Sequence, residues 1–244
     1  MRMLGLSTAR QLVEPIFTAG LCAGLAALPV TARAERPLAT EVADTIPAGH
    51  CQLEGWADHN NGAHEGHFAP ACGLVPGFEM AAEWAGSMPS RSDVQNRLLG
   101  FKWGPEWLEW EGARFGIKGL RVQERTPSAD DTSWHNHGTV LMGITSVPLD
   151  PNWTVHAHLG RNFMHNGEKD AMVYGVGLVW TPTDHWMLFA EVVGDHLHTA
   201  TQTVGVRYWI LPDKLGVDLT QTHSNATPGS SRTGFGIGWY LIHF

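Results

Sequence analysis

Most of the chain alternates apolar with small or polar residues, in segments of about ten residues separated by short breaks. In one segment, for example, Leu215, Val217 and Leu219 alternate with Gly216 and Asp218. A period of two is typical of β-strands with one apolar face, and no stretch shows a convincing helical period. We expect twelve strands, at 51–59, 68–76, 77–87, 94–104, 110–124, 138–148, 153–163, 170–181, 185–194, 200–211, 213–222 and 232–244.

The breaks between these segments are of two alternating kinds. Short breaks carry proline and lie at 75–77, 104–106, 148–152, 181–184 and 211–213. Longer polar breaks lie at 58–67, 87–93, 124–137, 162–170, 194–199 and 222–232. Short turns at one end and long loops at the other are typical of outer-membrane barrels, in which the short turns are periplasmic.

These two patterns predict an all-β fold, an antiparallel up-and-down transmembrane β-barrel of about twelve strands, with ten or fourteen as alternatives. The apolar face of each strand would contact lipid and the polar face would line the lumen. The mean hydropathy of −0.14 excludes a bundle of membrane helices, but averaging the two faces of a barrel strand gives a value near zero. A soluble, periplasmic, lipocalin-like binder is the alternative, and it predicts the inverse faces.

Aromatic residues strengthen the membrane interpretation. Seven of the 11 tryptophans fall near the predicted short turns, where indole rings would form an interfacial girdle: Trp103, Trp107, Trp110, Trp153, Trp180, Trp186 and Trp209. Tyr240, Ile242 and Phe244 alternate at the end of the last strand, as in the C-terminal signature that the barrel-assembly machinery of the outer membrane recognises. This phase places Gly236 and Gly238 on the outside.

The first residues have the pattern of a secretory signal peptide. Arg2 and Arg10 precede the apolar run 16–30, and an Ala-Arg-Ala cleavage pattern ends at Ala34. We expect a cleaved signal peptide at 1–34, a periplasmic N-terminal segment at 35–49 and an outer-membrane barrel at 50–244. This predicts export through the Sec pathway to the outer membrane of a Gram-negative bacterium.

Cys51 and Cys72 are predicted to form a disulfide. They lie at equal distances from Asn61-Gly62, so a hairpin centred there places them opposite each other, within reach of a bridge. The cell envelope is oxidising, which favours the bond over two buried thiols.

Charge limits the possible partners. The chain carries 16 basic and 24 acidic residues, and 13 basic and 23 acidic residues remain after 1–34, a net charge of −10. An acidic protein is a poor ligand for phosphate backbones, so we expect no nucleic-acid partner. The expected partners are outer-membrane lipid, the assembly machinery and a small solute. No nucleophile elbow or phosphate loop occurs, and Ser and His close together in sequence, such as Ser133 and His135, do not by themselves indicate an enzyme.

Histidine is unusually frequent, with 14 residues. Two residues at i and i+2 of a strand share a face, and paired imidazoles suit Zn²⁺, Cu²⁺ or Ni²⁺. The candidate ligands are His64, His67, His135, His137, His156, His158, His196 and His198. Carboxylates that would assist them are Asp58, Glu65, Asp130 and Asp195. The alternative is that these histidines are ordinary polar residues of loops and lumen.

The predicted lumen contains charges of both signs, which would pair across the interior. Its expected lining is Glu54, Glu79, Glu83, Lys102, Arg114, Lys118, His156, His158, Glu191, Arg207 and Asp218.

The start of the predicted mature chain, residues 36–49, contains the segment Pro37-Leu38-Ala39-Thr40-Glu41 followed by Gly49, and Glu54 lies in the first predicted strand. This opening resembles that of the putative MetA-pathway-of-phenol-degradation family of outer-membrane barrels. The resemblance implies a barrel of transporter type that passes aromatic compounds, and it assigns no binding residues. The cysteine pair and the His-rich loops are additions to that pattern.

Passive transport of small solutes is therefore the function that the sequence favours. The alternative is a structural or metal-binding surface barrel with a closed lumen.

Overall fold

The computed structural model describes residues 38–60, 63–88, 94–126, 133–165, 167–224 and 231–244, all within the compact unit Thr31–Phe244. The predicted signal peptide 1–34 and Asp130 lie outside these residues. The described part contains no helix long and apolar enough to cross a membrane.

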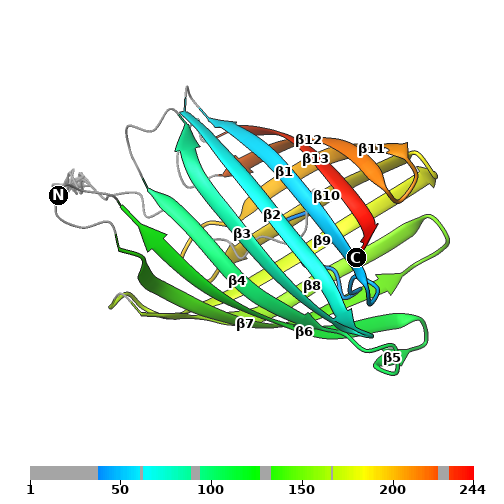
Figure 1. Cartoon of the computed structure of the whole chain (residues 1–244), viewed down its shortest axis with the longest axis horizontal. Helices are drawn as coiled ribbons and strands as arrows, with labels where there is room; N and C mark the ends of the chain where they lie inside the picture. The colour runs from blue at the N-terminus through cyan, green and yellow to red at the C-terminus, as the bar shows by residue number, and fades with distance from the viewer. Residues whose placement is uncertain (1–37, 61–62, 89–93, 127–132, 166, 225–230) are drawn as a thin grey trace, which may run out of the picture. The chain divides into compact units, whose positions relative to one another are not determined.

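The described residues form a closed antiparallel barrel of twelve long strands plus one two-residue strand (Figure 1). The strands are β1 (His50–Asn60), β2 (Ala63–Val75), β3 (Phe78–Met88), β4 (Gln95–Trp103), β5 (Glu109–Trp110), β6 (Ala113–Arg125), β7 (His135–Pro148), β8 (Trp153–Met164), β9 (Ala171–Thr183), β10 (Trp186–Asp195), β11 (Thr201–Leu211), β12 (Leu215–Ser224) and β13 (Ser231–His243). Long strands that follow one another in the chain pair side by side, β4 pairs with β6, and β1 pairs with β13 to close the ring. The predicted fold class and strand number are confirmed.

Two expected boundaries differ. The strand expected at 110–124 is interrupted at Glu111 and Gly112, whose φ angles of 50° and 82° make a tight hairpin between β5 and β6. Such a two-residue turn requires positive φ at both central positions. The long loop expected at 58–67 is instead paired strand as far as Asn60 and Ala63, since the hairpin register continues to its tip.

The faces of the strands follow the predicted alternation. On β3, Met80 and Trp84 are 41% and 47% exposed, whereas Glu79 and Glu83 are 2% and 8% exposed. On β12, Leu219 is 52% exposed and Asp218 is 2% exposed. The outside is therefore apolar and the inside polar, the inverse of what the lipocalin-like alternative requires.

In the last strand, β13, the side chains that face outward differ from those predicted. Phe235, Ile237 and Trp239 point outward and are 50–60% exposed, while Gly236 and Gly238 face inward. Tyr240 is half-buried, and its hydroxyl donates to Glu54 inside the barrel. Leu241 has a φ of 53°, a local break in the regular strand, after which Phe244 is 65% exposed. The predicted phase, with Gly236 and Gly238 on the outside, is therefore wrong for the body of this strand.

Most of the predicted tryptophan girdle lies as expected near the short turns. Trp107 and Trp110 are 73% and 71% exposed, and Trp153 stacks on Trp180 with ring centroids 5.5 Å apart. Trp209 differs, because its ring packs against Tyr240 and the Arg207 guanidinium on the inner side.

The predicted disulfide is present. Cys51 pairs directly with Cys72 in the register of β1 and β2, and their sulfur atoms are bonded. It clamps the hairpin at the end of the barrel that carries the short turns, where the N–H of Phe244 also donates to Gly49.

Candidate solute pathway and its N-terminal plug

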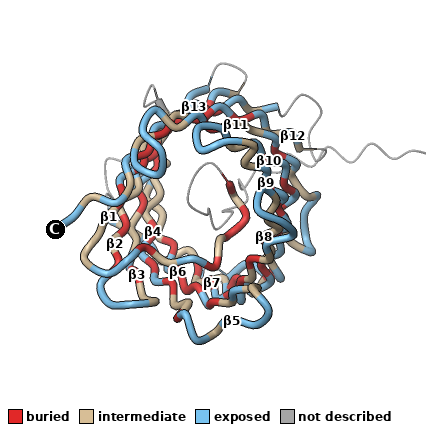
Figure 2. The backbone as a smooth tube through the Cα atoms, turned by 90° about the vertical axis from the view of Figure 1, so that its right-hand side faces the viewer, coloured by how far each residue is buried: buried red, intermediate tan, exposed pale blue. Residues whose placement is uncertain are grey.

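The N-terminal segment from Leu38 to Ala48 lies inside the ring of strands (Figure 2). The sequence predicted 35–49 as a separate periplasmic segment, but Thr40 and Glu41 are fully buried. Ala48 bridges to Gly73 near the short-turn end, and the segment extends from there into the barrel. We call Leu38–Ala48 the plug.

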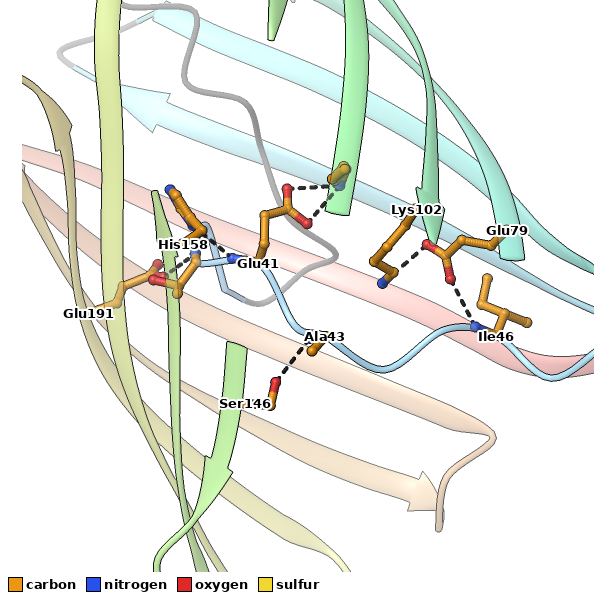
Figure 3. A network of polar contacts seen from close by, with 10 residues as sticks. Glu41, Ala43, Ile46, Glu79, Lys102, Ser146, His158 and Glu191 are labelled. Atoms are coloured by element: carbon orange, nitrogen blue, oxygen red, sulfur yellow. Dashed lines mark hydrogen bonds and ion pairs between the residues drawn. The ribbon is translucent and has the colours of Figure 1, made fainter. Parts of the chain in front are cut away.

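Glu191 of β10 holds the inner end of the plug (Figure 3). Its carboxylate accepts the backbone N–H of Ala39 at 2.9 Å, through both oxygens, and that of Thr40 at 2.7 Å. Hydrogen bonds from N–H groups to a carboxylate are among the stronger ones in proteins. They satisfy backbone donors that would otherwise be buried without a partner.

Glu41 is the charged anchor of the plug. Its carboxylate accepts two hydrogen bonds from the Lys118 ammonium of β6, at 2.8 and 2.7 Å. Its backbone N–H donates to Nδ1 of His158 on β8 at 3.1 Å. A ring nitrogen that accepts carries no proton, so the proton of the neutral His158 ring lies on Nε2.

Two further contacts hold the plug nearer the short-turn end. The N–H of Ala43 donates to Oγ of Ser146 at 2.9 Å, and this oxygen lies 2.8 Å from Nδ1 of His156. The N–H of Ile46 donates to Glu79 at 2.8 Å. The other Glu79 oxygen lies 3.1 Å from the Lys102 ammonium (Figure 3).

Glycines in the barrel wall make room for the plug backbone. A Cβ on Gly73 would lie 2.1 Å from the carbonyl oxygen of Ile46, and one on Gly104 would lie 2.6 Å from that of Ala43. Real Cβ atoms essentially never come so close to backbone, so these two positions need glycine while the plug is in place.

A second polar cluster lies on the other side of the interior. Arg207 of β11 donates to Asp218 of β12 at 2.9 Å and lies 3.8 Å from Glu54 of β1. All three side chains are at most 3% exposed. The hydroxyl of Tyr240 also donates to Glu54. The cluster thus links the first strand to the last ones across the closure of the barrel.

Ten of the eleven predicted lining residues are buried on inward faces. Arg114 is the exception. It has the inward phase of Lys118, but it lies at the rim, where its side chain is 52% exposed and pairs with Asp44 and Glu109. The tertiary structure therefore places Arg114 at the rim of the barrel, at the end that carries the short turns.

The interior is acidic. Among the described residues, the buried ionisable side chains other than histidine are seven carboxylates and three cations: Glu41, Glu54, Asp58, Glu79, Glu83, Glu191, Asp218, Lys102, Lys118 and Arg207. A cavity of about 40 Å³, lined in part by Gln52, Glu54 and Trp56, lies beside them. It has room for water rather than for an organic solute.

Among the described residues, the candidate histidines other than His67 belong to no group of three metal-ligating side chains. His156 and His158 share the inward face, but their Nδ1 atoms contact Ser146 and the Glu41 backbone. Nδ1 of His196 accepts the Met172 N–H.

The remaining candidate histidines have separate neighbours. His198 contacts Asp195 at 2.9 Å, and His137 lies 3.7 Å from Glu124. His135 and His64 are exposed, the latter beside His59, whereas His67 is buried.

Sequence reasoning missed the plug. Locally, the segment Leu38–Glu41 shows only its family resemblance, and its hydrogen-bond partners in the barrel are 77 to 152 residues away. The only local signal is the polar pair Thr40 and Glu41 ahead of the first strand. That pair does not indicate which barrel residues would bind the segment.

No family model matches the chain, and no curated protein matches it in sequence. Solved structures match it in fold. A KdgM porin in complex with disordered oligogalacturonate is 9% identical with a TM-score of 0.60, covering 77% of this chain and 98% of that one. The COG4313 outer membrane channel from Pseudomonas putida F1 is 8% identical with a TM-score of 0.60, covering 82% and 98%. The chain has the fold of outer-membrane channels.

A third match, a NanC porin, is 8% identical with a TM-score of 0.55, covering 78% of this chain and 98% of that one. At such identities the likeness concerns the arrangement of the strands. The plug contacts and the acidic interior are features of this chain.

Proposed function

We propose that this protein is an outer-membrane channel for passive transport of small solutes. The observation that carries the proposal is a closed barrel with an apolar exterior and a charged interior. Apolar side chains facing out suit a lipid environment, and buried charges facing a lumen suit a polar path. The resemblance of residues 36–49 to the MetA-pathway family of transporter-type barrels supports the same function.

The acidic interior favours neutral or cationic solutes over anionic ones. Seven buried carboxylates against three buried cations give the lumen a negative potential, which raises the local concentration of cations. The KdgM structure was solved with oligogalacturonate, a polyacid. Such a ligand would be repelled here, so the substrate class differs from that of this neighbour.

The plug sets the conducting state. In the conformation described, backbone groups of the plug occupy Glu191, His158, Ser146 and Glu79, side chains that would otherwise face a passing solute. Transport therefore requires the plug to shift or leave the lumen.

We further propose that 1–34 directs export and that Phe244 at the end of the last strand is read by the barrel-assembly machinery. The exposed terminal aromatic supports the second point.

Single-channel recording in planar bilayers tests the function. The full mature chain is expected to show small, infrequent conductance steps, and a variant lacking residues 38–46 is expected to show steps several-fold larger. Glu191→Gln is expected to raise the open frequency because it weakens the three hydrogen bonds to the plug.

Glu106→Gln is the matched control, since Glu106 is exposed at a short turn. A folded deletion variant without conductance would contradict the channel and favour the structural barrel.

A further inference from the structure

Asp58, Glu65 and His67 bring their ligand atoms within 4.8 Å of one another near the long-loop end of the barrel. Asp58 lies two residues before the end of β1, and Glu65 and His67 lie near the start of β2, its neighbour (Figure 1). None of the three contacts the plug through the hydrogen bonds described above. We propose that these residues form a binding site for a divalent transition-metal ion of the Zn²⁺ type.

The register of the hairpin creates this cluster. Asp58 is directly opposite Glu65, and His67 is opposite Trp56, one inward position farther from the hairpin tip. Residues opposed across a pair, and their diagonal neighbours, are close enough to share a ligand. Two carboxylates opposed in this way repel each other, and a cation between them removes that repulsion.

The ring of His67 is oriented as a metal ligand usually is. Its side chain is 1% exposed and stacks on Trp56, with ring centroids 4.5 Å apart and planes 3° apart. Its Nδ1 lies 2.9 Å from Glu83 of β3. A carboxylate only accepts, so Nδ1 carries a proton and donates, which leaves Nε2 as the ring atom that a metal ion would bind. Histidines that bind a metal through one ring nitrogen usually donate the other ring N–H to a carboxylate, as His67 does to Glu83.

The distances suit a shared ion better than direct hydrogen bonds. Nε2 of His67 lies 3.5 Å from Oε2 of Glu65 and 3.9 Å from Oδ2 of Asp58. N–H···O hydrogen bonds are about 2.7–3.2 Å long. Two ligands at about 2.0–2.1 Å from one tetrahedral ion lie about 3.4 Å apart, so a small contraction of the cluster would close the site.

The charges also match a divalent ion. Asp58, Glu65 and Glu83 supply three negative charges, and the Arg232 guanidinium, 3.8 Å from Asp58 and 3.9 Å from Glu65, supplies one positive charge. The local sum of −2 balances a dication. One imidazole with two carboxylates favours Zn²⁺ over Ca²⁺ or Mg²⁺, which prefer oxygen ligands alone. A site with three protein ligands leaves a fourth position for water.

The site is open to the outer mouth. The side chains of Glu65 and Arg232 are 26% and 28% exposed, whereas those of Asp58 and His67 are 6% and 1% exposed. An ion can therefore enter from the long-loop end without unfolding the barrel.

Zinc titration of the refolded, chelator-treated full chain in detergent micelles, against a fluorescent chelator, tests the proposal. One equivalent is expected to bind, and His67→Gln and Asp58→Asn are each expected to weaken that binding at least tenfold. Glu83→Gln is expected to weaken it, because the charged acceptor behind the His67 ring becomes a neutral amide and the basicity of Nε2 falls. Arg232→Gln is expected to tighten it, because a competing cation is removed.

The exposed pair His59 and His64 provides the control, since their Nδ1 atoms are 3.3 Å apart and could bind metal by themselves. The double variant His59→Gln/His64→Gln is expected still to bind one equivalent of zinc. Loss of binding in this variant with retention in Asp58→Asn would overturn the proposal, as would the absence of any bound equivalent.

Two further measurements separate the site from folding effects. Heat-modifiable migration on gels establishes that each variant is folded, and Asp58→Asn, which keeps the side-chain shape, replaces His67→Gln if the latter does not fold. Cobalt substitution is expected to give the visible absorption of a tetrahedral site, lost in Asp58→Asn. Equal affinity for Ca²⁺, unchanged in His67→Gln, would contradict a transition-metal site.

Discussion

Glu41 and Lys118, 77 residues apart in the chain, form a buried ion pair with both carboxylate oxygens 2.7–2.8 Å from the ammonium. The pair joins the plug to the wall of β6, and both side chains are at most 6% exposed. A buried charge without its partner is far less stable than the same charge in water. The position of the plug against β6 therefore depends on both residues.

Removing either partner of this pair is expected to release the plug. In Glu41→Gln or Lys118→Gln, one charge remains buried and uncompensated, a loss of about 3–5 kcal/mol. The double variant is expected to lose less, because two neutral amides can bond each other. Hydrogen exchange of the amides of residues 38–46 measures the loss. Equal protection in the wild type and both single variants would contradict this anchoring role.

Gly73→Ala is expected to displace the start of the plug. The new Cβ would lie 2.1 Å from the Ile46 carbonyl oxygen and 2.5 Å from that of Pro47, both backbone atoms. Higher channel conductance and faster exchange at Ile46 are the expected results. Gly55→Ala is the control, because its Cβ would meet nothing nearer than 3.8 Å. Similar behaviour of the two variants would show that the plug does not depend on this close approach.

Replacing Cys51 and Cys72 together by serine is expected to lower the free energy of unfolding by about 3 kcal/mol, the chain-entropy value for a loop of this size. The two residues are 21 positions apart and directly opposed. Urea unfolding in lipid vesicles, with and without reductant, measures the effect. Reductant is expected to destabilise the wild type and leave the serine variant unchanged. A serine variant as stable as the oxidised wild type would show that strand pairing alone holds this hairpin.

The variant lacking residues 38–46 is expected to prefer K⁺ over Cl⁻. Without Glu41, six buried carboxylates still face three buried cations. The reversal potential across a salt gradient reports this preference, which is expected to shrink at 1 M salt, where the Debye length is about 3 Å. Glu191→Gln in the same background is expected to reduce it. A preference for Cl⁻ would contradict the proposed solute class.

The barrel was predictable because strand formation is local. Alternation such as that of Leu219 with Asp218 decides which face meets lipid, and the spacing of Cys51 and Cys72 decides the first hairpin register. The same register places Asp58 opposite Glu65, two residues that the sequence by itself indicates only as possible helpers of the histidines.

The sequence by itself thus determined the fold class, the strand number, the disulfide and the faces of most strands, though not of the last one, since each depends on near neighbours or on hairpin symmetry. Only the tertiary structure decided that the N-terminal segment enters the lumen, that Glu191 and Lys118 hold it, and that Tyr240 turns inward to Glu54. These contacts join residues 77 to 186 positions apart. These residues meet only when the barrel closes. No local sequence pattern indicates which strands will face one another across the interior.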